Sequence, residues 1–300
     1  MKALLFSLLT LLPSAAFACD VCGAPATGAN YSLIDIDNLK FLQFSTTYSN
    51  FEHLQDAKDN DGNAVLNDIL LRHTIRGSFP LGRNWSGKLD VPVVQSFRST
   101  SGPTSSVQGI GDLKVQFQWQ KKLAQSDTLT KVMRVSPFIN LPTGKFMQRG
   151  TDRTILPIWL QTGTGSWGSG LAAAYIQKRE YVGWSLQGSA QVFVSNERSY
   201  IPGARTSVRS AVFYVKNLKK ISLMPELALQ YDAFAKDAQY DAPLAYTGGE
   251  RWSLHTGIAA STKQWALQLS VQVPLLQGIP EDQPAARLAG FASLTYFMEK

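Results

Sequence analysis

The clearest pattern in this chain is a strict alternation of apolar and polar residues in segments of about ten positions. Between Trp265 and Pro274, the tryptophan and every second residue after it are apolar, and the residues between them are small or polar. Successive side chains of a β-strand point to opposite faces, so this segment predicts a strand with one apolar face. The alternation recurs along the chain at about 9–11 residues, the length of a strand that crosses a bilayer.

The alternation predicts twelve strands, and single-chain bacterial barrels have an even number. The connections between successive strands alternate between short turns and long polar loops, as in outer-membrane barrels. We therefore predict an all-β fold, a closed antiparallel transmembrane β-barrel over residues 39–300 with both termini in the periplasm. The pattern leaves the faces of 170–178 and 207–216 ambiguous. The predicted strands are 39–51, 67–80, 85–97, 111–121, 131–142, 165–178, 183–194, 206–216, 220–233, 251–262, 264–275 and 286–298.

Aromatic residues gather at the ends of the predicted strands in two groups. Amphipathic rings favour both interfaces of a bilayer, so two bands indicate a barrel surrounded by outer-membrane lipid. The pair Tyr296-Phe297 is also similar to the aromatic terminal strand that the barrel-assembly machinery reads during biogenesis. The group beside the short turns or the C-terminus is Trp85, Trp119, Trp184, Trp265 and Tyr296, and the group near the long loops is Tyr48, Phe97, Tyr231 and Trp252.

The first eighteen residues have the form of an export signal. Lys2 precedes an apolar run over 3–12, Pro13 ends that run, and Ala16-Phe17-Ala18 is a small-residue cleavage site. We predict that 1–18 is a signal peptide and that 19–38 is a periplasmic N-terminal segment. Together with the barrel pattern, this places the protein in the outer membrane of a Gram-negative bacterium.

The chain is basic, with a formal net charge of +7. Removing Lys2 with the signal leaves 28 basic against 22 acidic residues, a charge of +6. The basic residues are scattered rather than run together, and an exported protein rarely meets nucleic acid. The charge therefore argues against nucleic-acid binding and for an electrostatic bias of a pore or surface.

Charged residues also occupy the polar faces of the predicted strands, where they would point into the lumen. They have two interpretations: ion pairs that brace a narrow barrel, or a polar wall along a solute path with a slight preference for anions or polar solutes. Both can hold at once. These residues are Arg72, Arg76, Lys88, Asp90, Asp112, Lys114, Arg134, Glu226 and Asp232.

Cys19 and Cys22 are the only cysteines, and they lie at the predicted mature N-terminus. Three interpretations stay open. The pair could form a disulfide in the oxidising periplasm, bind a soft metal through two thiolates, or supply a lipidated Cys19. Two ligands do not make a metal site, and no third ligand lies nearby.

The histidines do not indicate an enzyme. His53 falls in a predicted loop, His73 lies on the apolar face of its strand, and His255 lies on a polar face. No histidine stands in a Ser–His–Asn motif of the outer-membrane phospholipase type, and no matching pair of serine and asparagine is evident. We expect no enzymatic activity and no cofactor.

The chain carries a series of short motifs in the order LDVPVV (89–94), GIGDLK (109–114), LPTGK (141–145), LQTGTGSW (160–167) and VPLLQG (273–278). This series resembles the outer-membrane transporters grouped with the phenol meta-cleavage-pathway proteins, the MetA-pathway of phenol degradation-like family. This resemblance covers most of the barrel and implies a closed barrel that moves small, often hydrophobic or aromatic, compounds. The amino-terminal CDVCG is similar to a subset with an extended cysteine motif, but Ala24 stands where that subset continues with another cysteine.

These observations favour a passive transporter or channel for a small solute, since no energy-coupling feature is recognisable. The alternative is a structural or partner-binding barrel with a closed lumen, in which 19–38 docks a periplasmic partner through its cysteine pair. An outer-membrane hydrolase is the least supported hypothesis.

Overall fold

The computed structural model describes residues 40–55, 64–99, 104–126, 128–280 and 283–298. Cys19 and Cys22 lie outside these residues, as do the predicted signal peptide and N-terminal segment. The interpretations of the cysteine pair therefore stay predictions, and so does the periplasmic placement of both termini. In the described part of the chain, no helix is long and apolar enough to cross a membrane.

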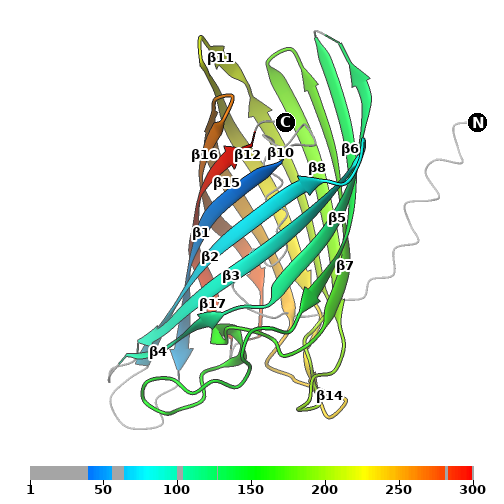
Figure 1. The fold of residues 1–300 in the computed structure, drawn as a ribbon. Helices are drawn as coiled ribbons and strands as arrows, with labels where there is room; N and C mark the ends of the chain where they lie inside the picture. The colour runs from blue at the N-terminus through cyan, green and yellow to red at the C-terminus, as the bar shows by residue number, and fades with distance from the viewer. Residues whose placement is uncertain (1–39, 56–63, 100–103, 127, 281–282, 299–300) are drawn as a thin grey trace, which may run out of the picture.

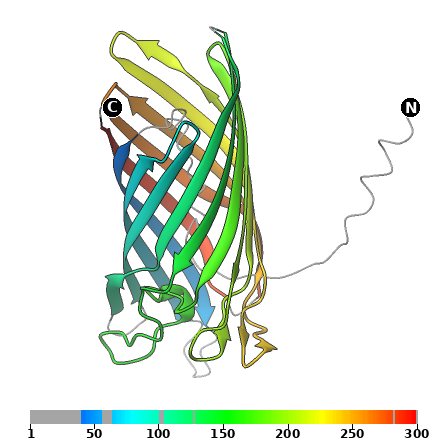
Figure 2. The ribbon, with the colours of Figure 1, turned by 45° about the vertical axis from the view of Figure 1, so that its right-hand side comes forward.

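Twelve long antiparallel strands form a closed barrel (Figures 1 and 2). Each strand is hydrogen-bonded to its neighbours in the chain, and the pairing of β1 with β17 joins the first strand to the last. The bounds of the barrel strands are β1 Phe41–Gln55, β2 Ala64–Pro80, β3 Trp85–Ser99, β5 Leu113–Gln125, β6 Leu129–Leu141, β7 Gly168–Arg179, β8 Val182–Phe193, β10 Arg205–Tyr214, β12 Ile221–Phe234, β15 Gly249–Ser261, β16 Trp265–Gly278 and β17 Ala285–Phe297.

All twelve predicted strands are present, and the connections alternate in length as expected. The strand ends differ from the predicted ones by up to four residues, and two connections were wrong. The predicted loop over 98–110 contains β4, Ser105–Ile110, and the predicted turn over 122–130 shrinks to 126–128. In both places the hydrogen-bonded ladder continues where neither face is apolar, so alternation no longer marks the strand. Short strands flank the barrel: β11 (Lys216–Leu218), and a small sheet of β9 (Tyr200–Ile201), β13 (Ala238–Gln239) and β14 (Ala242–Pro243).

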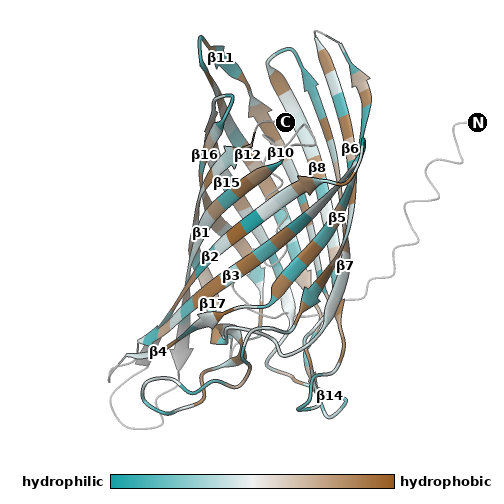
Figure 3. Cartoon of the chain, in the orientation of Figure 1, coloured by the Kyte–Doolittle hydropathy of each residue, from teal (hydrophilic) through white to brown (hydrophobic). Residues whose placement is uncertain are grey.

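The apolar face of the strands points outward, because their large apolar side chains are exposed and the side chains between them are mostly buried. Figure 3 shows the matching alternation of hydropathy along the strands. Leu267 and Leu269 on β16 are 46% and 48% exposed, whereas Ala266 on the inner face of the same strand is buried. Such exposure over the whole outer surface would be costly in water and is favourable in lipid. The barrel is therefore an outer-membrane barrel.

Both aromatic bands are formed. The Trp265 and Tyr296 rings contact each other on neighbouring strands at 4.8 Å between centroids, at the short-turn end. The rings of Tyr231 and Trp252 do the same at the long-loop end, also at 4.8 Å. These pairs mark the two levels at which the outer surface meets the membrane interfaces.

Glycines on the inner face make room for phenylalanine rings of adjacent strands. Gly183 on β8 lies beneath Phe213 of β10, and a Cβ added there would fall 2.0 Å from the ring. Phe213 is buried with Val132 and Ile176 in an apolar cluster at the short-turn end. Because glycine has no side chain, the Phe213 ring can pack in this cluster on the inner face without disturbing the hydrogen bonds between the strands.

We expect Gly183→Ala to destabilise the barrel by about 1–3 kcal/mol, because the added methyl group overpacks the space under Phe213. Gly188→Ala on the same strand is the matched control, since the nearest atom to its added Cβ is 3.8 Å away. Urea unfolding in detergent, followed by heat-modifiable gel migration, measures the difference. Equal midpoints for the two variants would refute this packing role.

Candidate functional site: a basic lumen narrowed by an inward loop

The structure places all eight predicted lumen residues on the inner face of the barrel. Most alternate with the exposed apolar residues of the same strands, and Arg76, Asp90 and Lys114 are neighbours across adjacent strands. Asp232, the ninth predicted residue, also points inward. The eight are Arg72, Arg76, Lys88, Asp90, Asp112, Lys114, Arg134 and Glu226.

On β2, β3 and β5, several cations surround one carboxylate. The guanidinium of Arg76 donates two hydrogen bonds to Asp90, of 2.6 and 2.7 Å. Lys114 lies opposite Asp90 in the next strand, with its Nζ 3.8 Å from the centre of the Phe138 ring. Lys88 donates to the Gln118 side chain at 3.2 Å. The bracing interpretation holds for Arg76 and Asp90, and the wall keeps a surplus of positive charge.

A second charged wall lies across the lumen on β10, β12 and β15. Arg209 pairs with Glu226, and Arg251 pairs with Asp232 at 3.0 Å. The guanidinium of Arg205 lies 5.0 Å from the centre of the Phe193 ring. The sequence prediction found the two acids of this wall and missed its three arginines.

The missed arginines have a local explanation. Thr206 and Ser210 place polar side chains on the outer face of β10, which blurs the alternation there. Ser210 is stable in that position because its hydroxyl accepts a hydrogen bond of 3.0 Å from the Trp184 indole. The two-residue spacing of Arg205, Ser207 and Arg209 was the signal that could have assigned the inner face.

The lumen as a whole is basic. Away from its short-turn mouth, the described strands and Asp112 between β4 and β5 line it with nine Arg and Lys side chains against five Asp and Glu, a net charge of +4. A channel with one dominant sign of charge and low-dielectric walls concentrates ions of the opposite sign. The nine cations are Arg72, Arg76, Lys88, Arg98, Lys114, Arg134, Arg205, Arg209 and Arg251, and the five anions are Asp68, Asp90, Asp112, Glu226 and Asp232.

The strand ladder beside β3 is interrupted at Pro92. Strand β5 pairs with β3 only as far as Asp90, and β4 pairs with it from Val93 onward. Proline has no N–H to donate, so the ladder cannot run straight through this position. Its carbonyl instead accepts from the Gly111 amide at 2.8 Å. Asp112 therefore stands outside the ladder, with its carboxylate available to the loop that follows β6.

Asp112 clamps both ends of that loop, residues 142–167. Its Oδ1 accepts from the Gly144 amide at 3.0 Å, and its Oδ2 accepts from the amide and hydroxyl of Thr164 at 2.8 and 2.7 Å. The hydroxyl of Thr143 donates to the Gly111 carbonyl at 2.8 Å. These residues belong to the GIGDLK, LPTGK and LQTGTGSW motifs. The three motifs therefore meet in one hydrogen-bonded clamp at the base of the loop.

Between its clamped ends, the loop bends into the lumen at the long-loop end. It contains a short 3-10 helix, η1 (Ile158–Leu160), and the Trp159 indole donates to Asp68 of β2 at 2.9 Å. Asp68 also accepts two hydrogen bonds from Arg98. Leu160 is completely buried and packs against Val107 of β4. The loop is thus anchored to the barrel wall at its base and near its helix.

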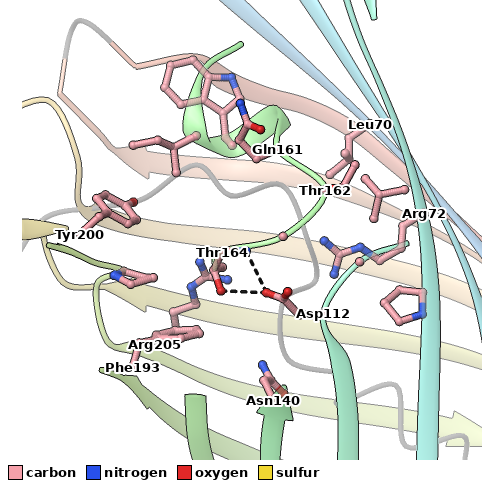
Figure 4. Close-up of a pocket in the computed structure, with 17 residues that line it drawn as sticks. Leu70, Arg72, Asp112, Asn140, Gln161, Thr162, Thr164, Phe193, Tyr200 and Arg205 are labelled. Atoms are coloured by element: carbon pink, nitrogen blue, oxygen red, sulfur yellow. Dashed lines mark hydrogen bonds between the residues drawn. The ribbon is translucent and has the colours of Figure 1, made fainter. Parts of the chain in front are cut away.

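The loop and the wall enclose a small cavity of about 90 Å³ (Figure 4). Arg72 lies on one side of the link between Asp112 and Thr164, and Arg205 lies on the other side. An apolar cavity of about 150 Å³ holds a benzene ring, so this smaller, polar space suits a few water molecules. We call this level the constriction, because the inward loop occupies part of the lumen there.

A second set of contacts holds the neighbouring loops around the constriction. The Phe146 ring stacks on Tyr200 with 5.2 Å between centroids. The Tyr200 hydroxyl donates to the buried carboxylate of Asp237, which also accepts from the Gly203 amide at 2.6 Å. Three long loops are therefore tied together at this mouth.

The described histidine side chains are not brought together. His73 points outward, where its ring lies 2.9 Å from the Thr46 hydroxyl, while His255 points into the lumen. Within the described ranges, no three His, Cys, Asp or Glu side chains are grouped so that they could hold a metal ion.

We expect Asp112→Asn to give larger and noisier single-channel currents in planar bilayers. An amide group cannot accept all three hydrogen bonds, and bonds to a charged acceptor contribute about 1.5–3 kcal/mol each, so the loop would leave the lumen more often. Glu197→Gln is the control, because it removes an exposed acid from the same mouth. An unchanged conductance in Asp112→Asn would contradict the clamp.

Comparison with known proteins supports the fold. Neither a protein-family model nor a curated protein sequence matches this chain. Among solved structures, the COG4313 outer membrane channel from Pseudomonas putida F1 matches with a TM-score of 0.65 and 14% identity, over 87% of this chain and 96% of that one. The β domain of the Bordetella autotransporter BrkA and the CymD monoaromatic hydrocarbon channel match at TM-scores of 0.49 and 0.42, with 11% and 7% identity, over 86% and 94% of this chain and 100% and 95% of theirs. The first match shows a shared barrel fold, and the other two are too distant to carry an argument.

Proposed function

We propose that this protein is a passive outer-membrane channel for small anionic solutes. The observation that carries the proposal is the surplus of basic side chains inside a closed barrel, a net charge of +4 along the described lumen. Fixed cations lower the energy of an anion that must leave bulk water to enter a narrow path. The solved barrel of the same fold is described as an outer membrane channel, which is consistent with this role.

The lumen favours polar over apolar solutes, although the family resemblance implies hydrophobic or aromatic ones. The Phe138 and Phe193 rings on the inner face are each covered by a cation, Lys114 and Arg205 respectively. Glutamine and serine side chains occupy many of the remaining inner positions. An apolar solute would therefore displace water from polar groups without replacing its hydrogen bonds.

Reversal potentials across planar bilayers under a KCl gradient test this proposal. We expect chloride to be preferred over potassium at about 0.1 M salt, where the screening length is about 10 Å, and the preference to weaken near 1 M, where it is about 3 Å. Lys114→Met should move the reversal potential toward zero by removing one lumen cation. Lys263→Met, in the exposed turn between β15 and β16, is the matched control and should leave it unchanged.

Two results would contradict the channel. The absence of any current above that of the empty membrane would favour a closed, partner-binding barrel. A preference for potassium would show that the lumen charge does not govern permeation.

A further inference from the structure

The two ends of the barrel carry very different charges. The five short turns and their flanking strand ends, at the top of Figure 1, hold ten Lys and Arg among their described residues against one acid, Glu180. Three long loops, 142–167, 194–204 and 235–248, hold five Lys and Arg against four Asp and Glu. Outside the lumen, the surplus of positive charge in the described residues therefore lies at the short-turn end. The segments counted there are 81–84, 121–126, 128–131, 178–181, 216–220 and 262–264.

Some of these cations lie on the outer wall of the barrel, just beyond the aromatic residues. Lys121 follows Trp119 by two positions on β5, so both side chains point outward. Strand β11 continues the register of β10 against β12, so Lys216 shares the outward face of Tyr214. Two residues advance a strand by about 7 Å, which is about 5 Å along the membrane normal at a tilt of about 40°. Both charges therefore lie at the depth of the lipid headgroups, which begin where the hydrocarbon core of about 30 Å ends.

Two more cations continue this row on the neighbouring strands. Lys121 pairs with Met133 of β6, and Lys131 is the next residue on the same face of β6. Lys131 pairs with Gln177 of β7, and Arg179 is the next residue on that face. Diagonal neighbours of this kind lie about 7–8 Å apart, so the three charges form one row across three strands.

We call Lys121, Lys131, Arg179 and Lys216 the basic arc. Strands β5, β6, β7 and β11, which carry it, contain no Asp or Glu. Glu180 is the nearest described acid along the chain, and it lies in the exposed turn after β7. The positive charge of the arc is therefore not balanced by acids on its own strands.

The position of the arc favours lipid over a soluble partner. A Lys or Arg near a membrane surface attracts anionic lipid, and neighbouring charges add to one another. Below the arc, the rings of Tyr175 and Trp184 contact each other at 5.9 Å between centroids, at the level of the interface. A lipid on the outer wall would therefore lay its chains on the apolar strand residues and bring its phosphate level with the arc. A soluble partner approaching this end would first meet the turn residues, such as Lys219, Lys220 and Lys263.

We propose that the basic arc binds the headgroups of anionic phospholipids. Short turns of outer-membrane barrels face the periplasm, so the arc would contact the periplasmic leaflet. Several charges on one side of the wall would hold such lipids there and fix the depth of the barrel in the membrane. This role goes beyond conduction and does not depend on it.

Lipid binding to the folded barrel in detergent tests the arc. Phosphatidylglycerol and phosphatidylcholine with the same acyl chains serve as probes, because both contain a phosphate and only the first has a net negative charge. Native mass spectrometry in about 0.1 M ammonium acetate, where the screening length is about 10 Å, counts the bound lipids. We expect the first phosphatidylglycerol to bind with a dissociation constant about tenfold lower than that of phosphatidylcholine.

A triple variant, Lys121→Gln with Lys131→Gln and Arg179→Gln, should lose most of this preference. The matched control is Lys219→Gln with Lys220→Gln and Lys263→Gln, which removes the same number of charges from the turns and should keep the preference. Both variants are first checked for heat-modifiable gel migration. If the arc variant does not fold, Lys216→Gln takes its place with Lys219→Gln as its control, and the preference should fall about twofold in the first only.

The outcomes separate the arc from other uses of this charge and from the channel. Equal binding of the two lipids by the unmodified barrel, or an equal loss of preference in both variants, would overturn the arc. A loss confined to the turn variant would also overturn it, and would make the turns the binding surface for an acidic partner. A barrel that prefers phosphatidylglycerol through the arc but passes no ion current would support this inference and refute only the channel.

Discussion

A closed antiparallel ladder in lipid leaves each strand residue only two environments, the bilayer or the lumen. No water reaches the hydrocarbon core, so every backbone N–H and C=O must be paired between strands, and an open sheet edge is excluded. The pleat then sends successive side chains alternately outward and inward. The apolar outer surface, the aromatic bands and the polar lumen all follow from this single constraint.

The lumen adds a second constraint, because charges placed there must be balanced or hydrated. Ion pairs such as Arg76 with Asp90 and Arg251 with Asp232 satisfy part of it. The interruption of the β3 ladder at Pro92 releases Asp112, which holds the loop after β6 inside the barrel. The same geometry therefore places a clamped loop inside a basic lumen.

The alternation predicted the strands well because each side chain of a membrane-spanning strand faces either the lipid or the lumen, and the two faces differ in polarity. It failed at strand ends beyond the lipid, as in β4, and on β10, where Ser210 satisfies its hydroxyl on the outer face through Trp184. The lumen residues on β2 to β6 could be predicted, while the partners of Glu226 and Asp232 could not. The clamp by Asp112 could not be predicted from the sequence either, because it joins residues from three separate segments and shows no periodicity. The motifs GIGDLK and LPTGK marked those segments without revealing their contact.

The central claim is that the lumen is a continuous, basic path through the barrel. Thiol labelling tests it most directly, with Ser45→Cys pointing into the lumen of β1 and Thr46→Cys pointing into lipid as the control, both with Cys19 and Cys22 replaced by serine. We expect an anionic methanethiosulfonate to modify Ser45→Cys faster than a cationic one of matched size, from either side of the membrane. Equal or slower reaction of the anionic reagent, or protection of Ser45→Cys from both reagents, would contradict the account.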